Sequence, residues 1–197
     1  MQKRTVAVLI FPGVELLDFA GPFEVFSAAR ASAESRDRLM DVFTVAEMQN
    51  PIRCNNPVTV VADYMLPECP AADIVVVPGG QGTRTAIDRP KLVDWIAARA
   101  QQAELMTSVC TGSFLLAKAG LLTGKAATTH WGSIERMRND FPDVAVRENT
   151  RWVDAGDVVS SSGVSAGIDM ALYVLQRLYG TAIAAATARG IEYDHWQ

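Results

Sequence analysis

The run Leu105-Met106-Thr107-Ser108-Val109-Cys110-Thr111-Gly112-Ser113 decides how this chain folds. Residues 105–109 predict a buried strand, as in a parallel sheet, and they lead directly into Cys110. Residues 113–119 then predict a helix, which is closed by Gly120 and Gly124. A buried strand that turns sharply into a helix is typical of a doubly wound α/β fold.

The same alternation extends to both sides of this run. Further strands are expected at 5–10, 41–46, 58–61, 73–77, 126–129, 152–153 and 157–160, and helices at 22–30, 90–101, 132–139, 166–178 and 182–188. Pro22 suits the first turn of its helix. The pair 41–46 and 58–61 fits an antiparallel excursion around the Asn55-Asn56-Pro57 turn. Short connections predict one α/β domain over residues 1–197, with a doubly wound, mostly parallel sheet and helices on both faces.

Composition and charge limit the partners of this chain. Hydrophobic residues make up 49% and charged residues 20% of the 197, which predicts a globular protein rather than a disordered one. A net charge of −4 without a dense Lys/Arg cluster argues against nucleic acid as a partner. The apolar runs are shorter than the ~20 residues of a membrane helix. The first run ends at Pro12-Gly13, too soon for a signal peptide. We therefore expect a cytoplasmic location.

The cysteines and histidines give no sign of a cofactor. Cys54, Cys69 and Cys110 cannot all pair within one chain, and none forms a CxxC motif. The two histidines, His130 and His195, lack the HExxH pattern, so we expect neither a metal nor a cofactor. His195 lies in a polar tail, where a surface position is expected.

Cys110 is the candidate nucleophile because it stands where a strand ends and a helix begins. The partial positive charge of a helix N-terminus lowers the pKa of a thiol there and favours the thiolate. Such a turn is often strained, like a nucleophile elbow. Ligands of doubly wound sheets bind beyond the carboxyl ends of the strands, where Gly79-Gly80 and Ser162-Gly163 also fall. The alternative is a buried structural cysteine, which suits Cys54 and Cys69.

Five motifs, in order, resemble the ThiJ/PfpI superfamily. They are Leu16-Leu17-Asp18-Phe19-Ala20-Gly21-Pro22, Val77-Pro78-Gly79-Gly80, Ser108-Val109-Cys110-Thr111-Gly112-Ser113, Ala127-Thr128-Thr129-His130-Trp131 and Gly163-Val164-Ser165-Ala166-Gly167-Ile168-Asp169. The first motif is similar to the branch that contains isocyanide hydratases and the sensor domains of AraC-type regulators. The resemblance, from about Val6 to Tyr193, implies a flavodoxin-like or glutamine-amidotransferase-like fold and a homodimer.

The resemblance also implies an acidic side chain beside the cysteine, and the matching residue is Asp18. Glu15 and Glu24 are nearby competitors, and Asp18 could instead serve a turn or cap. The protease-like branch has His after the cysteine, where this chain has Thr111, so peptidase activity is not expected. The Thr111 hydroxyl would bind substrate or water, or it would sit at the helix start as a cap.

Several further residues complete the expected site. His130 would tune the thiolate or relay a proton, or it would cap the helix that starts near Gly132. The resemblance assigns the amides of Gly80 and Thr111 to an oxyanion pocket, with Gly79 in the same glycine turn, and Ser162 and Gly163 to the pocket wall. Gly163-Val164-Ser165-Ala166-Gly167 formally matches the GxSxG elbow of serine hydrolases. Only about 30 residues follow Ser165, which leaves no room for the remaining strands of that fold.

The resemblance implies three alternative functions, and all three depend on Cys110. The first is hydration of an isocyanide to an N-substituted formamide through a covalent thioimidate, with Asp18 relaying protons. The second is glyoxalase or deglycase activity on 2-oxoaldehydes, where the acid is usually Glu rather than Asp. The third is a non-catalytic redox or ligand sensor. The similar regulators carry a further helix-turn-helix domain, and nothing basic follows Gln197, so we expect no direct DNA binding.

Overall fold

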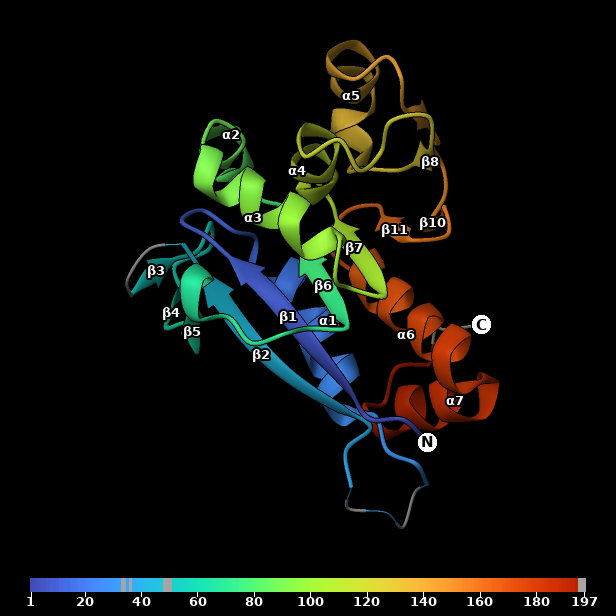
Figure 1. Cartoon of the computed structure of the whole chain (residues 1–197). Coiled ribbons are helices and arrows are strands. Elements are labelled where there is room, and N and C mark those ends of the chain that lie inside the picture. Colours follow the sequence, from blue (N-terminus) through green and yellow to red (C-terminus); the bar gives the residue numbers. More distant parts are fainter. Residues whose placement is uncertain (33–34, 36, 48–50, 195–197) are drawn as a thin grey trace.

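A seven-stranded sheet forms the centre of the computed structural model, which describes residues 1–32, 35, 37–47 and 51–194 (Figure 1). Its strand order is β10-β11-β7-β6-β1-β2-β5. The strands span Arg4–Ile10 (β1), Met40–Ala46 (β2), Tyr64–Met65 (β5), Ile74–Val77 (β6), Leu105–Val109 (β7), Trp152–Asp154 (β10) and Val158–Ser161 (β11). All neighbours run parallel except β10, which is antiparallel to β11. The predicted mostly parallel α/β sheet is confirmed.

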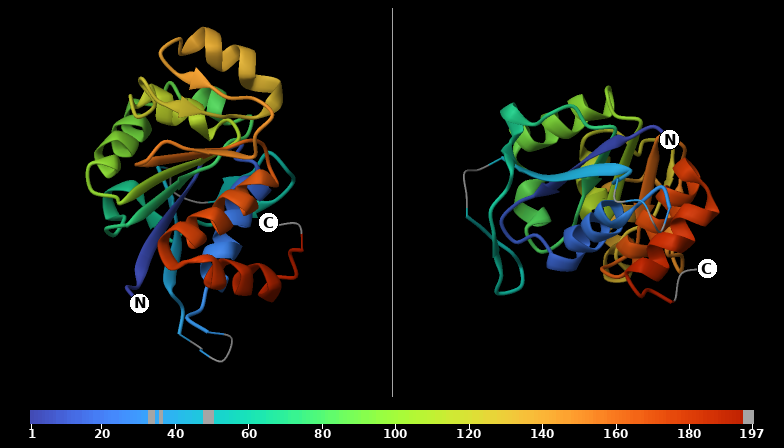
Figure 2. Two further views of the ribbon diagram at one scale, coloured as in Figure 1. Left: turned by 90° about the vertical axis from the view of Figure 1, so that its right-hand side faces the viewer. Right: turned by 90° about the horizontal axis from the view of Figure 1, so that it is seen from below.

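Helices cover both faces of this sheet (Figure 2). They are α1 (Leu16–Ala28), α2 (Thr83–Ala86), α3 (Pro90–Ala100), α4 (Gly112–Lys118), α5 (Ile134–Asp140), α6 (Ala166–Tyr179) and α7 (Thr181–Gly190), with 3-10 turns η1 (Leu66–Glu68) and η2 (Trp131–Ser133). Helices α1, α6 and α7 pack together on one face, and α3 and α4 pack together on the other. Helix α5 stands beyond the carboxyl ends of the central strands (Figure 1).

The central strands are buried on both sides because helices cover both faces. Every residue of β6, β7 and β11 is buried, and so are the last five residues of β1. This burial explains why β1 and β6 are nearly continuous apolar runs instead of alternating patterns. Strands β7 and β11 also bury polar residues, which are Thr107, Ser108, Ser160 and Ser161. The burial of apolar surface in this layer is the main favourable contribution to folding.

Two expected elements are wrong in detail. The first helix begins at Leu16 rather than Pro22 and ends at Ala28, so Pro22 lies inside it. Pro22 has no N–H to donate to the carbonyl of Asp18, yet the helix tolerates it because packing against α6 and β2 holds its buried face.

The second error concerns the antiparallel excursion. Strand β2 runs parallel to β1 within the main sheet. The antiparallel pair is instead Ile52–Arg53 (β3) with Thr59–Val60 (β4), around the expected turn. Another small pair joins Ala126–Ala127 (β8) to Ala145–Val146 (β9) in parallel. Among the described helices, none has the length and apolar character required to cross a membrane.

Candidate active site around Cys110

Strand register brings three turns together at the carboxyl edge of the sheet. Val77 of β6 lies opposite Ser108 of β7, and Val109 lies opposite Ser161 of β11. The residues that follow these strands therefore meet at one place. These are the Gly79-Gly80 turn, Cys110 and the Ser162-Gly163 turn, three of the regions that the sequence singles out.

Cys110 occupies a strained turn between β7 and α4. Its φ angle is +57°, which is uncommon for a residue other than glycine. Its N–H lies 3.2 Å from the carbonyl oxygens of both Ser161 and Ser162. Its own carbonyl accepts bonds from the hydroxyls of Ser113 (3.1 Å) and Thr129 (3.0 Å). The surrounding structure thus holds this conformation from both sides, as a nucleophile elbow requires.

Two glycines allow the turns to approach each other closely. A Cβ atom on Gly112 would lie 2.0 Å from the carbonyl oxygen of Val77. A Cβ atom on Gly79 would lie 2.5 Å from the Thr111 nitrogen and 2.9 Å from Oδ2 of Asp18. Larger residues at either position would push the strand ends apart, so the glycines are needed for space.

Asp18 lies in the first turn of α1, completely buried beside Cys110. Its Oδ2 accepts a 3.0 Å hydrogen bond from the Gly79 amide, while Oδ1 has no hydrogen bond of regular geometry among the described residues. Burial raises the pKa of Asp18 to about 7, although the Gly79 amide and the Cys110 thiol both act to lower it. The nearby Val164 amide also lowers it, and Val164 has a φ of +50°, a strained value for a β-branched residue.

The pKa of the Cys110 thiol is shifted in the direction opposite to the one expected from the sequence. Burial, together with the negative charge of Asp18, raises its pKa to about 12, although hydrogen bonds from Thr111 act to lower it. The predicted lowering of this pKa by the helix N-terminus is therefore wrong. Helix α4 has only seven residues, and its start is outweighed by burial and by a neighbouring carboxylate.

The Thr111 hydroxyl links the elbow to the glycine turn and does not cap α4. It accepts bonds from the Gly80 amide at 3.0 Å and from the Thr83 hydroxyl at 3.1 Å. The Gly80 amide is thus occupied by Thr111. The oxyanion roles of the Gly80 and Thr111 amides stay predictions. To bind a substrate, the Gly80 amide would first have to break its hydrogen bond to the Thr111 hydroxyl.

His130 caps the 3-10 turn η2, which agrees with the expectation that it caps the helical segment near Gly132. Its Nδ1 accepts a 3.2 Å bond from the Gly132 amide, so a neutral ring carries its proton on Nε2. A Cβ atom on Gly163 would lie 2.3 Å from Cδ2 of this ring, which explains the glycine there. The role of His130 as a proton relay stays a prediction.

A pocket of about 170 Å³ contains Cys110 in its wall. Its other lining residues are Glu15, Asn55, Gly80, Gln81, Thr83, Arg84, Thr111, His130, Ser133, Arg136 and Val164. A larger hollow of about 560 Å³ shares His130 and Val164 with it and includes Ser162 and Gly163. A molecule that contacts Cys110 would therefore lie in the smaller pocket, and the larger hollow would give it room to extend past His130.

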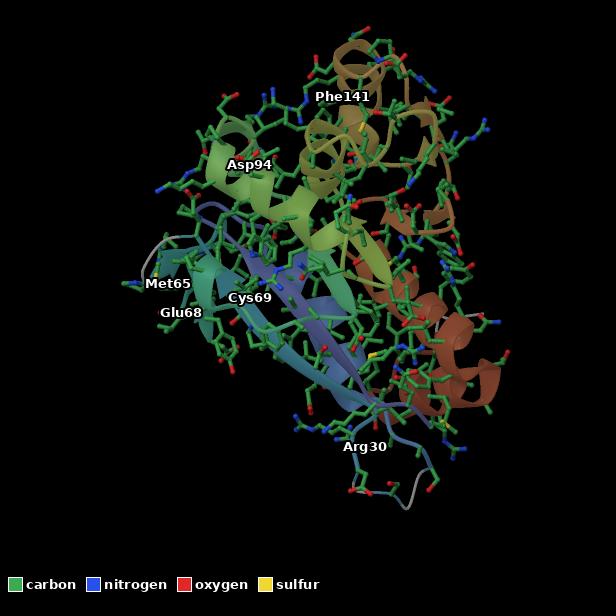
Figure 3. The ribbon with its side chains drawn as sticks, in the orientation of Figure 1. Arg30, Met65, Glu68, Cys69, Asp94 and Phe141 are labelled. Carbon is green, nitrogen blue, oxygen red and sulfur yellow. The ribbon has the colours of Figure 1, made fainter. Side chains whose placement is uncertain are left out.

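The remaining candidates are not beside the Cys110 sulfur. Glu24 lines a separate hollow, and Glu15 lines the pocket wall while it accepts a 2.9 Å bond from Asn55. Ser165 stands at the start of α6, bonded by Arg151. Cys54 and Cys69 are buried outside both hollows; Figure 3 shows Cys69 near the β5 edge. His195 lies outside the described residues. Within the described ranges, no group of three His, Cys, Asp or Glu side chains could hold a metal.

Some lining residues escaped the sequence reasoning. Thr83 and Arg84 belong to α2, a helix of four residues that is too short to show a hydrophobic period. Arg136 lies on an expected helix, but the face it presents depends on how α5 is placed over the sheet. The positive φ of Val164 has no signature in a β-branched residue. These residues depend on tertiary structure.

Comparison with known proteins gives matches over most of the chain. A model described as the DJ-1/PfpI family matches residues 4–177. An isonitrile hydratase from Pseudomonas putida is 33% identical over 189 residues, which cover 95% of this chain and 78% of that protein. The transcriptional regulator GbdR from Pseudomonas aeruginosa is 36% identical over 125 residues, 64% of this chain but 34% of the regulator. A ThiJ/PfpI family protein from Pseudomonas syringae has a TM-score of 0.87 at 28% identity, covering 98% of this chain and 76% of that one.

Proposed function

This chain belongs to the DJ-1/PfpI family, and we propose that it hydrates an isocyanide to an N-substituted formamide at Cys110. The observation that carries the proposal is the pairing of Cys110 with Asp18, whose pKa is raised to about 7. A carboxyl group that exchanges its proton near neutral pH suits general acid and base catalysis beside a nucleophile. The similarity to the isonitrile hydratase supports the choice of reaction.

The first half of the proposed reaction forms a covalent intermediate. The carboxylate of Asp18 accepts the thiol proton of Cys110 while the sulfur bonds to the terminal carbon of the isocyanide. Asp18 then delivers this proton to the same carbon, which gives a thioimidate, S–CH=N–R. A thiol pKa of about 12 fits this order, because the sulfur loses its proton only as it attacks.

The second half releases the product. Water adds to the thioimidate carbon, and one of its protons passes through Asp18 to the nitrogen. The carbon–sulfur bond then breaks, and the remaining hydroxyl proton returns to the sulfur as the formamide carbonyl forms. The net reaction consumes one isocyanide and one water and leaves Cys110 and Asp18 as they began.

The sensor alternative has one observation in its favour, the similarity to GbdR. Oxidation by peroxide requires a thiolate, however, and burial with Asp18 raises the pKa of Cys110 to about 12. This argument favours an enzyme over a redox sensor. A ligand sensor would bind the same small molecules without turning them over.

Turnover of p-nitrophenyl isocyanide tests the proposal. We expect the purified protein to form N-(4-nitrophenyl)formamide and Cys110→Ser to lose at least about 100-fold in kcat/KM. Cys69→Ser is the matched control, because it removes a buried thiol outside the pocket.

Two results would reject the hydratase proposal. They are an unchanged isocyanide and full turnover by Cys110→Ser. An unchanged isocyanide together with lactate formation from methylglyoxal would point to the glyoxalase alternative.

A further inference from the structure

We propose that the substrate of the Cys110 pocket is a small carboxylate, an isocyano carboxylic acid, whose anionic group is bound by Arg84 and Arg136 together. The inference rests on the proposed function for the reacting carbon at Cys110. The anion site itself is argued from two side chains that no catalytic step uses. Arg84 comes from α2 and Arg136 from α5, and both line the 170 Å³ pocket.

Two positive charges, those of Arg84 and Arg136, lie in this pocket wall, and neither is paired with a carboxylate of the described residues. Burial lowers the pKa of Arg136, the positive charge of Arg84 lowers it further, and Asp140 offsets this only in part. Within the described part of the chain, neither arginine forms an ion pair. Glu15 also lines the wall, and its carboxylate accepts a hydrogen bond from the side-chain amide of Asn55 rather than pairing with either arginine. Two guanidinium groups that repel each other in one pocket suit an anion that bridges them.

Arg136 is held in place by its stacking. Its Cζ lies 3.9 Å from the ring centroid of Phe114, which is itself buried in α4. The Phe114 ring packs edge-on against Phe141, with centroids 6.0 Å apart, at the end of α5 labelled in Figure 3. A guanidinium fixed in this way loses little conformational freedom when it binds a ligand.

Arg136 also has an unsatisfied donor. Its Nε is buried but has no hydrogen-bond partner among the described residues. A buried donor without an acceptor is unfavourable, so such groups are rare. Because the burial of Nε also closes it off from the pocket, the carboxylate would bind the terminal nitrogens of this guanidinium group. The small volume places that carboxylate on the same short molecule as the carbon that Cys110 attacks.

Alkylation of Cys110 tests the anion site without any enzyme turnover. Iodoacetate and iodoacetamide have similar size and the same leaving group, and in both cases the sulfur–carbon bond forms as iodide departs. They differ in charge, so the ratio of their rate constants at Cys110 reports the local potential. Peptide mass spectrometry follows Cys110, while Cys54 and Cys69 in the same digest report any general opening of the fold.

We expect the iodoacetate-to-iodoacetamide ratio to fall about tenfold in the double variant Arg84→Gln, Arg136→Gln. Arg138→Gln is the matched control and should keep the ratio of the unmodified protein. Arg138 lies on the same helix, but it pairs with Glu135 and Glu148 and does not line the pocket. An unchanged ratio in the double variant would overturn the proposal.

Two further measurements test the proposal even if the double variant folds poorly. Arg136→Lys keeps the charge and should keep most of the ratio, whereas a loss equal to that of Arg136→Gln would contradict the proposal. In the unmodified protein, salt from about 0.02 M to about 0.5 M should lower the iodoacetate rate and leave the iodoacetamide rate nearly constant. Equal salt dependence of both reagents would contradict the anion site.

The two proposals fail in different ways. A high iodoacetate ratio without isocyanide turnover would support the anion site and reject the hydratase. Turnover of p-nitrophenyl isocyanide with a flat ratio would support the hydratase and reject the anion site. If both hold, isocyanoacetate should have a KM about tenfold below that of its methyl ester, and the double variant should remove this difference.

Discussion

At the scale of single residues, the side chains of Asp18 and Cys110 are buried next to each other, so a state in which both are negatively charged is unfavourable. Burial raises both pKa values, to about 7 for Asp18 and about 12 for Cys110. The two groups are therefore expected to titrate as a pair rather than independently. Above pH 7 the pair holds one proton, which is bound to the sulfur of Cys110. This proton moves to the carboxylate of Asp18 as the sulfur attacks an electrophile.

Asp18→Asn tests this exchange. We expect kcat/KM of the unmodified protein for an isocyanide to rise with pH through an apparent pKa near 7, because the carboxylate form accepts the thiol proton. The variant should lose this inflection and at least about 100-fold in rate. Its Cys110 pKa should fall below about 12, since a neighbouring negative charge is removed.

Thiol absorbance or the pH dependence of iodoacetamide alkylation measures that pKa. Glu24→Gln is the control, because Glu24 lies on the same helix as Asp18 but lines a separate hollow. A thiol pKa that stayed the same in Asp18→Asn would disprove the coupling.

Asp18 also predicts how stability depends on pH. Its folded pKa of about 7 exceeds the unfolded value near 3.9, so the folded state binds more protons between these values. Stability therefore falls as pH rises from about 4 to about 7.5, by on the order of 3 kcal/mol from this residue. Urea denaturation at several pH values should show this loss in the unmodified protein and not in Asp18→Asn. Parallel curves for the two proteins would contradict it.

The residues of the site were predictable only where a motif carries them. Cys110 and Asp18 stand in sequence runs with recognisable order, and the structure places Asp18, rather than Glu15 or Glu24, beside the sulfur. The protonation of Cys110 was not predictable, because the helix-terminus argument does not include burial or the charge of a residue 92 positions away along the chain.

At the scale of elements, the site depends on how closely α4 approaches the end of β6. Gly112→Ala would place a Cβ atom 2.0 Å from the Val77 carbonyl oxygen, so the helix must shift away from the strand. We expect a loss of about 2–3 kcal/mol in the free energy of unfolding, measured by urea denaturation. Gly190→Ala, with no atom within 4 Å of its Cβ, should change stability by less than about 0.5 kcal/mol. Equal effects of the two substitutions would contradict this role of Gly112.

The elements differed in how well the sequence predicts them. Strands β1 and β6 are predictable because burial on both faces makes them nearly continuous apolar runs. Strand β7 is mostly apolar but also buries Thr107 and Ser108. The start of α1 was misplaced because Pro22 reads as a first-turn residue, while tertiary packing keeps it inside the helix. Strand β5, with two residues, is too short to show a periodic pattern.

At the scale of the whole molecule, one sheet supports both the core and the site. The strands that carry the site are central, and their helices come from both halves of the chain (Figure 2). We expect a single cooperative unfolding transition, because no part of this sheet has a core of its own. Tryptophan fluorescence, from Trp95, Trp131 and Trp152 among others, and far-UV circular dichroism should give the same urea midpoint. An earlier fluorescence transition would indicate that a region unfolds separately.

The clamped main chain of Cys110 has a consequence for experiments. Its N–H and carbonyl are both bonded to neighbouring segments, so the bond from the main chain to the side chain leaves in a fixed direction. Bond formation at the sulfur therefore requires little rearrangement around it, and lattice forces should not oppose it. Crystals soaked with a slow isocyanide and frozen at intervals should keep diffracting while the density on the sulfur first grows and then disappears.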